Sequence, residues 1–392
     1  MATTSKCPKH EVCGSCKWSH IPYKKQLKQK LSDINGSLAI KKLDLKCTEI
    51  LPSPVTDHYR NRMDFVINFE GLVGMREKGK WWRVIDNHTC FLSDEKIENL
   101  FSKIHAWSKS AGLSYFDRKS HVGLLRYAVV RSTSTGETLI NIITSDPSVS
   151  EVPEDDKSTH KPCVESEEDI RAVLENLQEL AGPTTLIWTT NATISDVSFG
   201  EKETVITGPG YLTENINGVS YRISPQSFFQ TNLYAAPLLQ ETVVGLIDED
   251  AKTVLDLYCG SGFFSLPIAQ KVDHVTGVEL NEFAIADAKI NAEQNKITNV
   301  EFFSAKTESL KLTDYKADTI VVDPPRSGMH DDALASLMET GAKQIIYISC
   351  SYKNLARELV TLTEKYEVAD MLAIDMFPHT PHVEVVCNLR LK

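Results

Sequence analysis

The sequence predicts an α/β protein that joins a doubly wound, mostly parallel sheet to a β-rich domain. Two observations support this prediction. After Pro225, short apolar strands alternate with helical stretches, which is typical of a parallel sheet covered by helices, and these strands are expected at 254–257, 274–278, 319–323 and 344–348. From Tyr59 onward, in contrast, short strand-like segments follow one another and are separated by turn residues, as at 64–69, 71–74, 81–85, 124–130 and 138–144.

The domain organisation follows from length and composition. A chain of 392 residues is too long for one ordinary compact domain, so we expect two or three. We expect a cysteine-rich head with a helix over 1–50, a β-rich central domain over 51–222, and the α/β domain over 223–392. In the head, apolar residues at helical spacing predict a helix over Tyr23–Leu45. The run 145–169 is rich in Ser, Pro, Asp and Glu, and we expect an exposed acidic loop there.

Charge is distributed unevenly along the chain. The net charge is −11, yet the first 93 residues hold 16 Lys and Arg against 9 Asp and Glu. A basic N-terminal third could contact phosphates, or its lysines could form the solvated face of one helix, namely Lys24, Lys25, Lys28 and Lys30. No apolar run approaches the roughly 20 residues of a membrane span, and the first residues lack a signal-peptide core. We expect a soluble, cytoplasmic protein without membrane contact, and a monomer because no exposed apolar stripe is evident.

A glycine turn follows the first strand of the α/β domain. The run Asp256-Leu-Tyr-Cys-Gly-Ser-Gly262 leads into an apolar helix over 263–270. Gly260 and Gly262 could let a ligand approach the backbone, or they could form a plain tight turn. The next strand ends at Glu279, whose carboxylate could accept hydrogen bonds from a ribose. Both features together predict a cofactor that carries a ribose.

Three further strands end in residues that can perform chemistry. Asp323, Cys350 and the run before Glu384 each lie at a strand end. Because parallel strands open on one edge, these side chains can meet over one substrate. Taken alone, Cys350 could be a small core residue and Glu384 a surface charge.

Taken together, the motifs resemble the RNA 5-methyluridine methyltransferase family. The likeness covers nearly the whole chain and comprises Tyr59–Arg62, Gly74–Lys78, Leu125–Tyr127, Ser224–Gln230, the glycine turn, Asp323–Arg326, Ser349-Cys350 and Phe377–His379 with Glu384. The resemblance implies a Rossmann-like class I methyltransferase domain, S-adenosylmethionine as methyl donor, and an RNA uridine as substrate.

The same resemblance assigns roles to individual residues. Cys350 would add to carbon 6 of uracil, which makes carbon 5 nucleophilic, and Glu384 would remove the hydrogen from carbon 5. Cofactor contacts would come from Gln230, Tyr258, Gly260, Gly262, Glu279 and Asp323. Phe263 and Lys306 depart from the family pattern, so the sequence does not predict the contacts to the adenine.

The cysteine head contains a compact Cys7-x5-Cys13-x2-Cys16 motif, and Cys90 is the best candidate for a fourth soft ligand. Four thiolates can hold either structural zinc or an iron–sulfur cluster. The resemblance implies a [4Fe-4S] cluster on these four residues, with structural zinc as the alternative. The radical-enzyme spacing Cys-x3-Cys-x2-Cys is absent from the sequence, so we expect a structural or RNA-positioning role.

RNA binding should fall to the central domain. Basic residues interleave there with Phe69, Trp81 and Trp82, which could stack on bases or simply form core. The head begins too early for an additional N-terminal RNA-binding barrel, so we expect ribosomal RNA of the 23S type, with the T-loop of tRNA as the alternative.

Other classes of function fit less well. A cytosine-C5 methyltransferase would have a Pro-Cys pair where this chain has Pro324-Pro325-Arg326. An amino-methylating enzyme would have an aromatic residue after the proline pair and would need no thiol. A non-catalytic RNA-binding factor would not need both Cys350 and Glu384.

Overall fold

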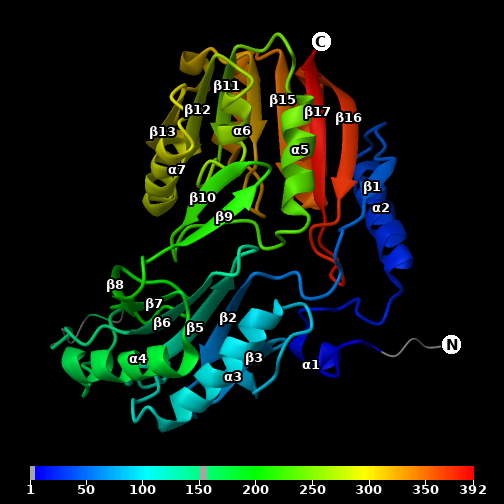
Figure 1. The fold of residues 1–392 in the computed structure, drawn as a ribbon. Helices are drawn as coiled ribbons and strands as arrows, with labels where there is room; N and C mark the ends of the chain where they lie inside the picture. Colours follow the sequence, from blue (N-terminus) through cyan, green and yellow to red (C-terminus); the bar gives the residue numbers. More distant parts are fainter. Residues whose placement is uncertain (1–4, 151–155, 157) are drawn as a thin grey trace.

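The computed structural model describes residues 5–150, 156 and 158–392. Figure 1 shows two large sheets, one in each half of the molecule, with the N-terminal segment along one side. The eight-stranded sheet has the order β1-β16-β17-β15-β14-β11-β12-β13. Its strands are β1 (Glu49–Leu51), β11 (Thr253–Leu257), β12 (His274–Glu279), β13 (Val300–Ser304), β14 (Thr319–Val322), β15 (Gln344–Ser349), β16 (Tyr366–Ile374) and β17 (Glu384–Leu391).

The eight-stranded sheet is parallel except for β17, which runs antiparallel to both β15 and β16. This arrangement confirms the predicted α/β class and the four predicted strands. Its inner strands carry apolar residues on both faces because helices cover both faces of the sheet. These helices are α5 (Ala236–Leu246), α6 (Ser265–Ala269), α7 (Glu282–Gln294), α8 (Asp331–Thr340) and α9 (Tyr352–Lys365). Two short 3₁₀ helices lie between β13 and β14, at Thr307–Ser309 and Leu312–Tyr315.

The N-terminal segment packs against the far end of this sheet. It contains α1 (His10–Cys13) and α2 (Tyr23–Ile40). Helix α2 contacts α9, and β1 pairs in parallel with β16. The expected extension of α2 to Leu45 is wrong, because the backbone turns into the left-handed region at Lys42, with φ 58°.

The seven-stranded sheet, called the central sheet below, has the order β4-β3-β2-β5-β6-β7-β8. Its pairs are antiparallel except β6–β7, where α4 makes the long crossover that parallel strands need. Helices α3 and α4 cover one face. The elements are β2 (Arg62–Ile67), β3 (Val73–Glu77), β4 (Lys80–Asp86), α3 (Glu95–Ser110), β5 (Leu125–Ser132), β6 (Thr138–Ser145), α4 (Glu167–Ala181), β7 (Thr185–Asn191) and β8 (Lys202–Thr207).

A hairpin of β9 (Leu212–Ile216) and β10 (Val219–Ile223) lies between the two sheets (Figure 1). We expected these residues to belong to the central domain, and Leu212 packs with Leu139 and Ile187 of the central sheet. Tyr221, in contrast, packs in one core with residues of α5 and α6. Its ring lies 5.4 Å from that of Phe229 and 6.1 Å from that of Phe263, centroid to centroid.

The acidic segment after β6 differs from the expected exposed loop over 145–169. Residues 151–155 and 157 lie outside the described part of the chain. Helix α4 already begins at Glu167, because Ser166 accepts a hydrogen bond from the Asp169 amide as an N-cap. His160 is buried, and its Nε2 accepts a hydrogen bond from the Asp146 amide. Among the described residues, no helix is both long and apolar enough to cross a bilayer.

Candidate active site

A cavity of about 850 Å³ opens at the carboxyl ends of β11, β12, β14 and β15. Tyr258, Glu279, Asp323 and Cys350 line it, each at or directly after the end of one of these strands. Gln230, Gly260 and Glu384 also line it. The structure therefore brings together seven of the eight catalytic and cofactor residues expected from the sequence.

Gly262 is the eighth residue and does not line the cavity. Its φ is +87°, and a Cβ there would lie 3.2 Å from both Leu266 and Phe302. Gly262 thus allows the turn and the helix behind it to pack closely, while Gly260 lies at the cavity itself.

Cys350 and Glu384 come together because β17 reverses direction. In the antiparallel ladder Ser349 pairs with Val385, so the next position along β15 places Cys350 beside Glu384. Glu384 is 7% exposed, and its Oε2 has no hydrogen-bond partner among the described residues. A buried carboxylate oxygen without a hydrogen-bond partner is costly. Glu384 Oε2 belongs to a residue that lines the cavity, where a substrate could interact with this oxygen.

Burial sets the electrostatics of the cavity. It raises the pKa of Glu384 and of Asp323, and each is raised further by acidic neighbours, while Arg326 lowers the pKa of Glu384. The pKa of the Cys350 thiol is raised to about 11, first by burial and then by Glu384 and Asp323, while Arg326 opposes the shift. Asp256, beneath the turn, has its pKa raised to about 7 by burial. Each of these carboxyl groups makes the ionisation of the others less favourable, and a positively charged ligand would reverse this effect.

The opposite end of the cavity is formed by the turn after β11. The Gly260 amide donates to Glu279 Oε2 at 3.3 Å, and the Asn281 amide donates to Glu279 Oε1 at 2.8 Å. Lys306 lines the cavity, whereas Phe263 is buried in the core beside Phe229 and Phe264. Of the two departures from the family pattern, only Lys306 can therefore contact a ligand directly.

Phe228, Arg326 and Phe377 also line the cavity, and the sequence analysis gave none of them a role there. Phe228 is 63% exposed although it is a large apolar residue. All three lie inside motifs that carry the family resemblance, and only the direction of their side chains was not predictable from the sequence.

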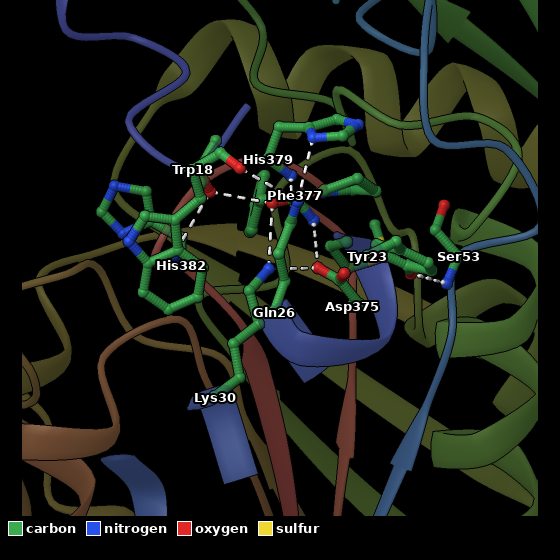
Figure 2. A network of polar contacts seen from close by, with 12 residues as sticks. Trp18, Tyr23, Gln26, Lys30, Ser53, Asp375, Phe377, His379 and His382 are labelled. Carbon is green, nitrogen blue, oxygen red and sulfur yellow. Dashed lines mark hydrogen bonds and ion pairs between the residues drawn. The ribbon is translucent and has the colours of Figure 1, made fainter. Parts of the chain in front are cut away.

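The loop between β16 and β17 brings Phe377 to the cavity, and Lys30 of α2 holds this loop from behind. Figure 2 shows the polar network that surrounds it. Lys30 Nζ donates to Asp375 Oδ1 at 2.6 Å and to the Phe377 carbonyl at 3.0 Å. Both ionised side chains are fully buried. The expectation that Lys30 is a solvated or phosphate-binding lysine is therefore wrong.

Gln26, one turn earlier on α2, joins this loop to the cysteine head. Its Oε1 accepts from the His379 amide at 2.8 Å, and its Nε2 lies 3.0 Å from His379 Nδ1 (Figure 2). The same Nε2 donates to the carbonyls of Trp18 and Ile21. His379 Nε2 contacts Asp57 Oδ1 at 3.1 Å, so a proton on Nε2 leaves Nδ1 as an acceptor, and the two N–H groups of Gln26 are shared among Nδ1 and the two carbonyls.

Comparison with known proteins places this geometry in a family. A family model described as tRNA (Uracil-5-)-methyltransferase matches residues 189–392. A tRNA (uracil(54)-C(5))-methyltransferase from Pyrococcus horikoshii is 33% identical over 386 residues, which cover 98% of this chain and 85% of the relative.

The chain belongs to the tRNA (uracil-5-)-methyltransferase family.

Two further proteins are similar to this chain over nearly its whole length. An RNA methyltransferase of Caldanaerobacter subterraneus, described as uncharacterised, is 35% identical over 97% of this chain and 84% of its own length. The crystal structure of Pyrococcus abyssi tRNA (uracil-54, C5)-methyltransferase in complex with S-adenosyl-L-homocysteine superposes with a TM-score of 0.77 at 30% identity, over 96% of this chain and 85% of that one. The fold is thus the class I methyltransferase fold, and the chain is an S-adenosylmethionine-dependent RNA (uracil-C5) methyltransferase.

The four cysteines that the uracil-5-methyltransferase resemblance assigned to a cluster lie in one region. Cys7, Cys16 and Cys90 are buried in one core, and Cys13 is half-buried. Burial and the neighbouring Cys7 raise the pKa of Cys16 to about 12. Within the described part of the chain, however, no group of three or more His, Cys, Asp or Glu side chains is arranged to hold a metal ion. The thiols are gathered but not in coordination geometry.

Proposed function

We propose that this enzyme methylates carbon 5 of a uridine in tRNA, with Cys350 as nucleophile and Glu384 as base. One observation carries the proposal, the placement of Cys350 beside Glu384 in a cavity that also contains Asp323 and Glu279. No other cysteine lines this cavity among the described residues.

The chemistry requires both residues. The Cys350 thiolate forms a bond to carbon 6 of the uracil, and the electron pair of the carbon 5–carbon 6 double bond moves into an enolate. S-adenosylmethionine supplies the methyl group that carbon 5 takes. Glu384 then accepts the proton from carbon 5, the double bond re-forms, and the sulfur–carbon bond breaks. A carboxylate that is buried and whose pKa is raised is a stronger base than one in water, which suits Glu384.

The cavity also fits the cofactor. S-adenosylmethionine carries a positively charged sulfonium, which carboxyl groups would favour. Asp323, Glu279 and Asp256 supply such groups at the turn, and burial together with Asp256 and Glu279 raises the pKa of Asp323. Glu279 would accept hydrogen bonds from the ribose, because it stands at the end of the second strand of the sheet. Gln230 and Tyr258 would complete the cofactor pocket, and Gly260 would let the cofactor approach the backbone closely.

The choice of tRNA over ribosomal RNA rests on the relatives. The sequence analysis favoured ribosomal RNA, but the Pyrococcus relatives reported above are named for uracil 54 of tRNA, and they match along nearly the whole chain. This supports the alternative weighed there. The monomeric state and the cytoplasmic location stay predictions.

For the cysteine head, we propose that Cys7, Cys13, Cys16 and Cys90 hold a [4Fe-4S] cluster, with structural zinc as the alternative. Four thiols gathered in one largely buried region are a soft donor set. The proposal is tested by iron, zinc and acid-labile sulfide analysis of anaerobically purified wild type and Cys16→Ser. About four irons and four sulfides per chain support a cluster, and one zinc per chain supports the alternative. Neither metal in the wild type would contradict both.

The methylation proposal is tested with radiolabelled S-adenosylmethionine and unmodified transcripts of tRNA or of 23S-type ribosomal RNA. Wild type, Cys350→Ala and the control Cys163→Ala, a cysteine outside the cavity, are compared by nucleoside analysis. We expect label in 5-methyluridine of tRNA, retained in Cys163→Ala and lost in Cys350→Ala. Label only in ribosomal RNA would overturn the choice of substrate, and an undiminished signal from Cys350→Ala would overturn the mechanism.

A further inference from the structure

A second cavity, of about 110 Å³, lies on the central sheet. Along β2, Phe65 and Ile67 face the core that contains α3 and α4, whereas Val66 packs in a separate cluster with Tyr127. Since side chains alternate along a strand, Val66 and Tyr127 lie on the face opposite the helices. Both line the second cavity, which therefore lies on that face.

Three large aromatic side chains border this cavity without being buried. Phe69 is 50% exposed, Trp81 47% and Trp82 50%. The possibility that they are core residues is therefore excluded. Large aromatic side chains that stay exposed together are typical of a binding surface.

A buried guanidinium faces the cavity beside these aromatics. Arg126 is 3% exposed, and its Cζ lies 3.9 Å from the centroid of the Phe116 ring. Its Nε donates to Ser145 Oγ and its Nη1 to the Thr193 carbonyl. Nη2 has no hydrogen-bond partner among the described residues. A buried donor without a partner is costly, and a ligand that brings an acceptor oxygen would remove that cost.

The charge of the cavity is positive. Four basic residues line it against two acidic ones, Asp117 and Asp196. Asp196 is already bound by Arg76 at 2.5 Å and by Arg118 at 2.8 Å. The Arg118 guanidinium also stacks over Trp81, 4.5 Å from the ring centroid. A polyanion with flat, hydrogen-bond-accepting groups complements this arrangement.

We propose that the second cavity binds an unpaired base of the substrate RNA, other than the uridine that is methylated. The cavity volume of about 110 Å³ corresponds to roughly four waters at about 30 Å³ each, which is on the order of the volume of one pyrimidine ring. The base stacks on Trp81 or Trp82, and one of its carbonyl oxygens accepts from Arg126 Nη2. This inference rests on the proposed function, because it takes the ligand to be the RNA substrate.

The face of the central sheet that carries the second cavity runs toward the first cavity along β5. Arg131 and Tyr127 alternate onto this face of β5, and Arg131 Nη2 donates to the Ser227 carbonyl at 2.6 Å. The next residue, Phe228, lines the first cavity. Four residues separate the pair Arg62–Arg131 from the pair Val66–Tyr127, a distance of about 13 Å along the strands.

The experiment measures the dissociation constant for an unmodified tRNA transcript, with full-length protein, across a series of salt concentrations. The variants are Trp82→Ala, Trp81→Ala and Arg118→Ala, which alter partly exposed side chains. The controls are Arg171→Ala and Leu180→Ala, which alter exposed side chains of α4 on the opposite face of the same sheet. Thermal unfolding and S-adenosylhomocysteine binding of each variant show that the fold and the first cavity are intact.

We expect at least one Trp variant to weaken RNA binding about tenfold at every salt concentration, because base stacking does not depend on released ions. Arg118→Ala should weaken binding and also reduce the slope of log affinity against log salt by about one. Both controls should bind like wild type. Wild-type affinity of folded Trp81→Ala and Trp82→Ala would overturn the proposal. Because binding is measured apart from methylation, this outcome differs from a failure of the proposed function, in which wild type binds RNA but makes no 5-methyluridine.

Discussion

Lys30 Nζ lies 2.6 Å from Asp375 Oδ1, and neither side chain is exposed to solvent. The two residues are 345 positions apart. This ion pair fixes α2 to the loop that leads into Glu384, so the position of that end of β17 depends on a residue that is distant in the sequence.

Lys30→Met should destabilise the protein strongly, because it leaves Asp375 as an unpaired buried charge. Breaking a buried ion pair on one side costs about 3–5 kcal/mol. Lys30→Met with Asp375→Leu should recover part of this loss, since neither charge then remains buried. Urea denaturation measures the free energies of unfolding. Lys28→Met, on the exposed side of the same helix, serves as control and should change stability by less than about 0.5 kcal/mol. Equal stability of Lys30→Met and Lys28→Met would contradict the prediction.

Gln26→Leu should slow methyl transfer more than it weakens cofactor binding. The substitution removes the hydrogen bonds that hold His379 and the Trp18 carbonyl, so the loop before Glu384 loses its fixed position. Small displacements of reacting groups are costly, and we expect kcat to fall roughly tenfold or more with the KM for S-adenosylmethionine changed less than threefold. Gln29→Leu, at an exposed position three residues later, should behave like wild type. A change in KM alone would argue against a positioning role.

Glu384→Gln should trap the enzyme on its RNA. The amide cannot accept the proton from carbon 5, so the sulfur–carbon bond formed by Cys350 cannot break after methylation. We expect a protein–RNA adduct that survives denaturing electrophoresis, together with a fall in turnover of at least about a hundredfold. Glu384→Gln combined with Cys350→Ala should give no adduct. An adduct that persists in the double variant would mean that another residue is the nucleophile.

The rate should rise with pH across the neutral range. The pKa of Cys350 is raised to about 11, so at lower pH the thiol is protonated and the thiolate fraction grows about tenfold per pH unit. We expect log kcat/KM to increase with pH from about 6.5 to 9. Arg326 lowers the pKa of Cys350, so Arg326→Ala should shift the profile to higher pH and reduce the rate at pH 8. A profile of kcat/KM that is flat above pH 7 would show that the thiol is already ionised in the free enzyme and would contradict the prediction.

Much of the fold was predictable because its signals are local. The strands of the eight-stranded sheet are short apolar runs, and the rule that parallel strands end on one edge correctly placed Asp323 and Cys350 at one cavity. The position of β1 was not predictable, since a pairing of three residues with β16 leaves no pattern in either segment. The burial of Lys30 was not predictable for a similar reason. Its partner Asp375 is distant in the sequence, and a helical lysine ordinarily faces water. The exposure of Trp81 and Trp82 required the structure, because an aromatic in a strand can face either side.

The pairing of β1 with β16 also has a consequence for biosynthesis. Residues 49–51 leave the ribosome early, whereas residues 366–374 follow more than 300 positions later. Until then α2 and β1 have no sheet to join, and Lys30, which is buried only in the folded protein, stays in water without its counter-ion. Contacts between such distant segments form slowly, and an unfinished sheet edge is prone to aggregate. The eight-stranded sheet is therefore completed only when both ends of the chain have been made.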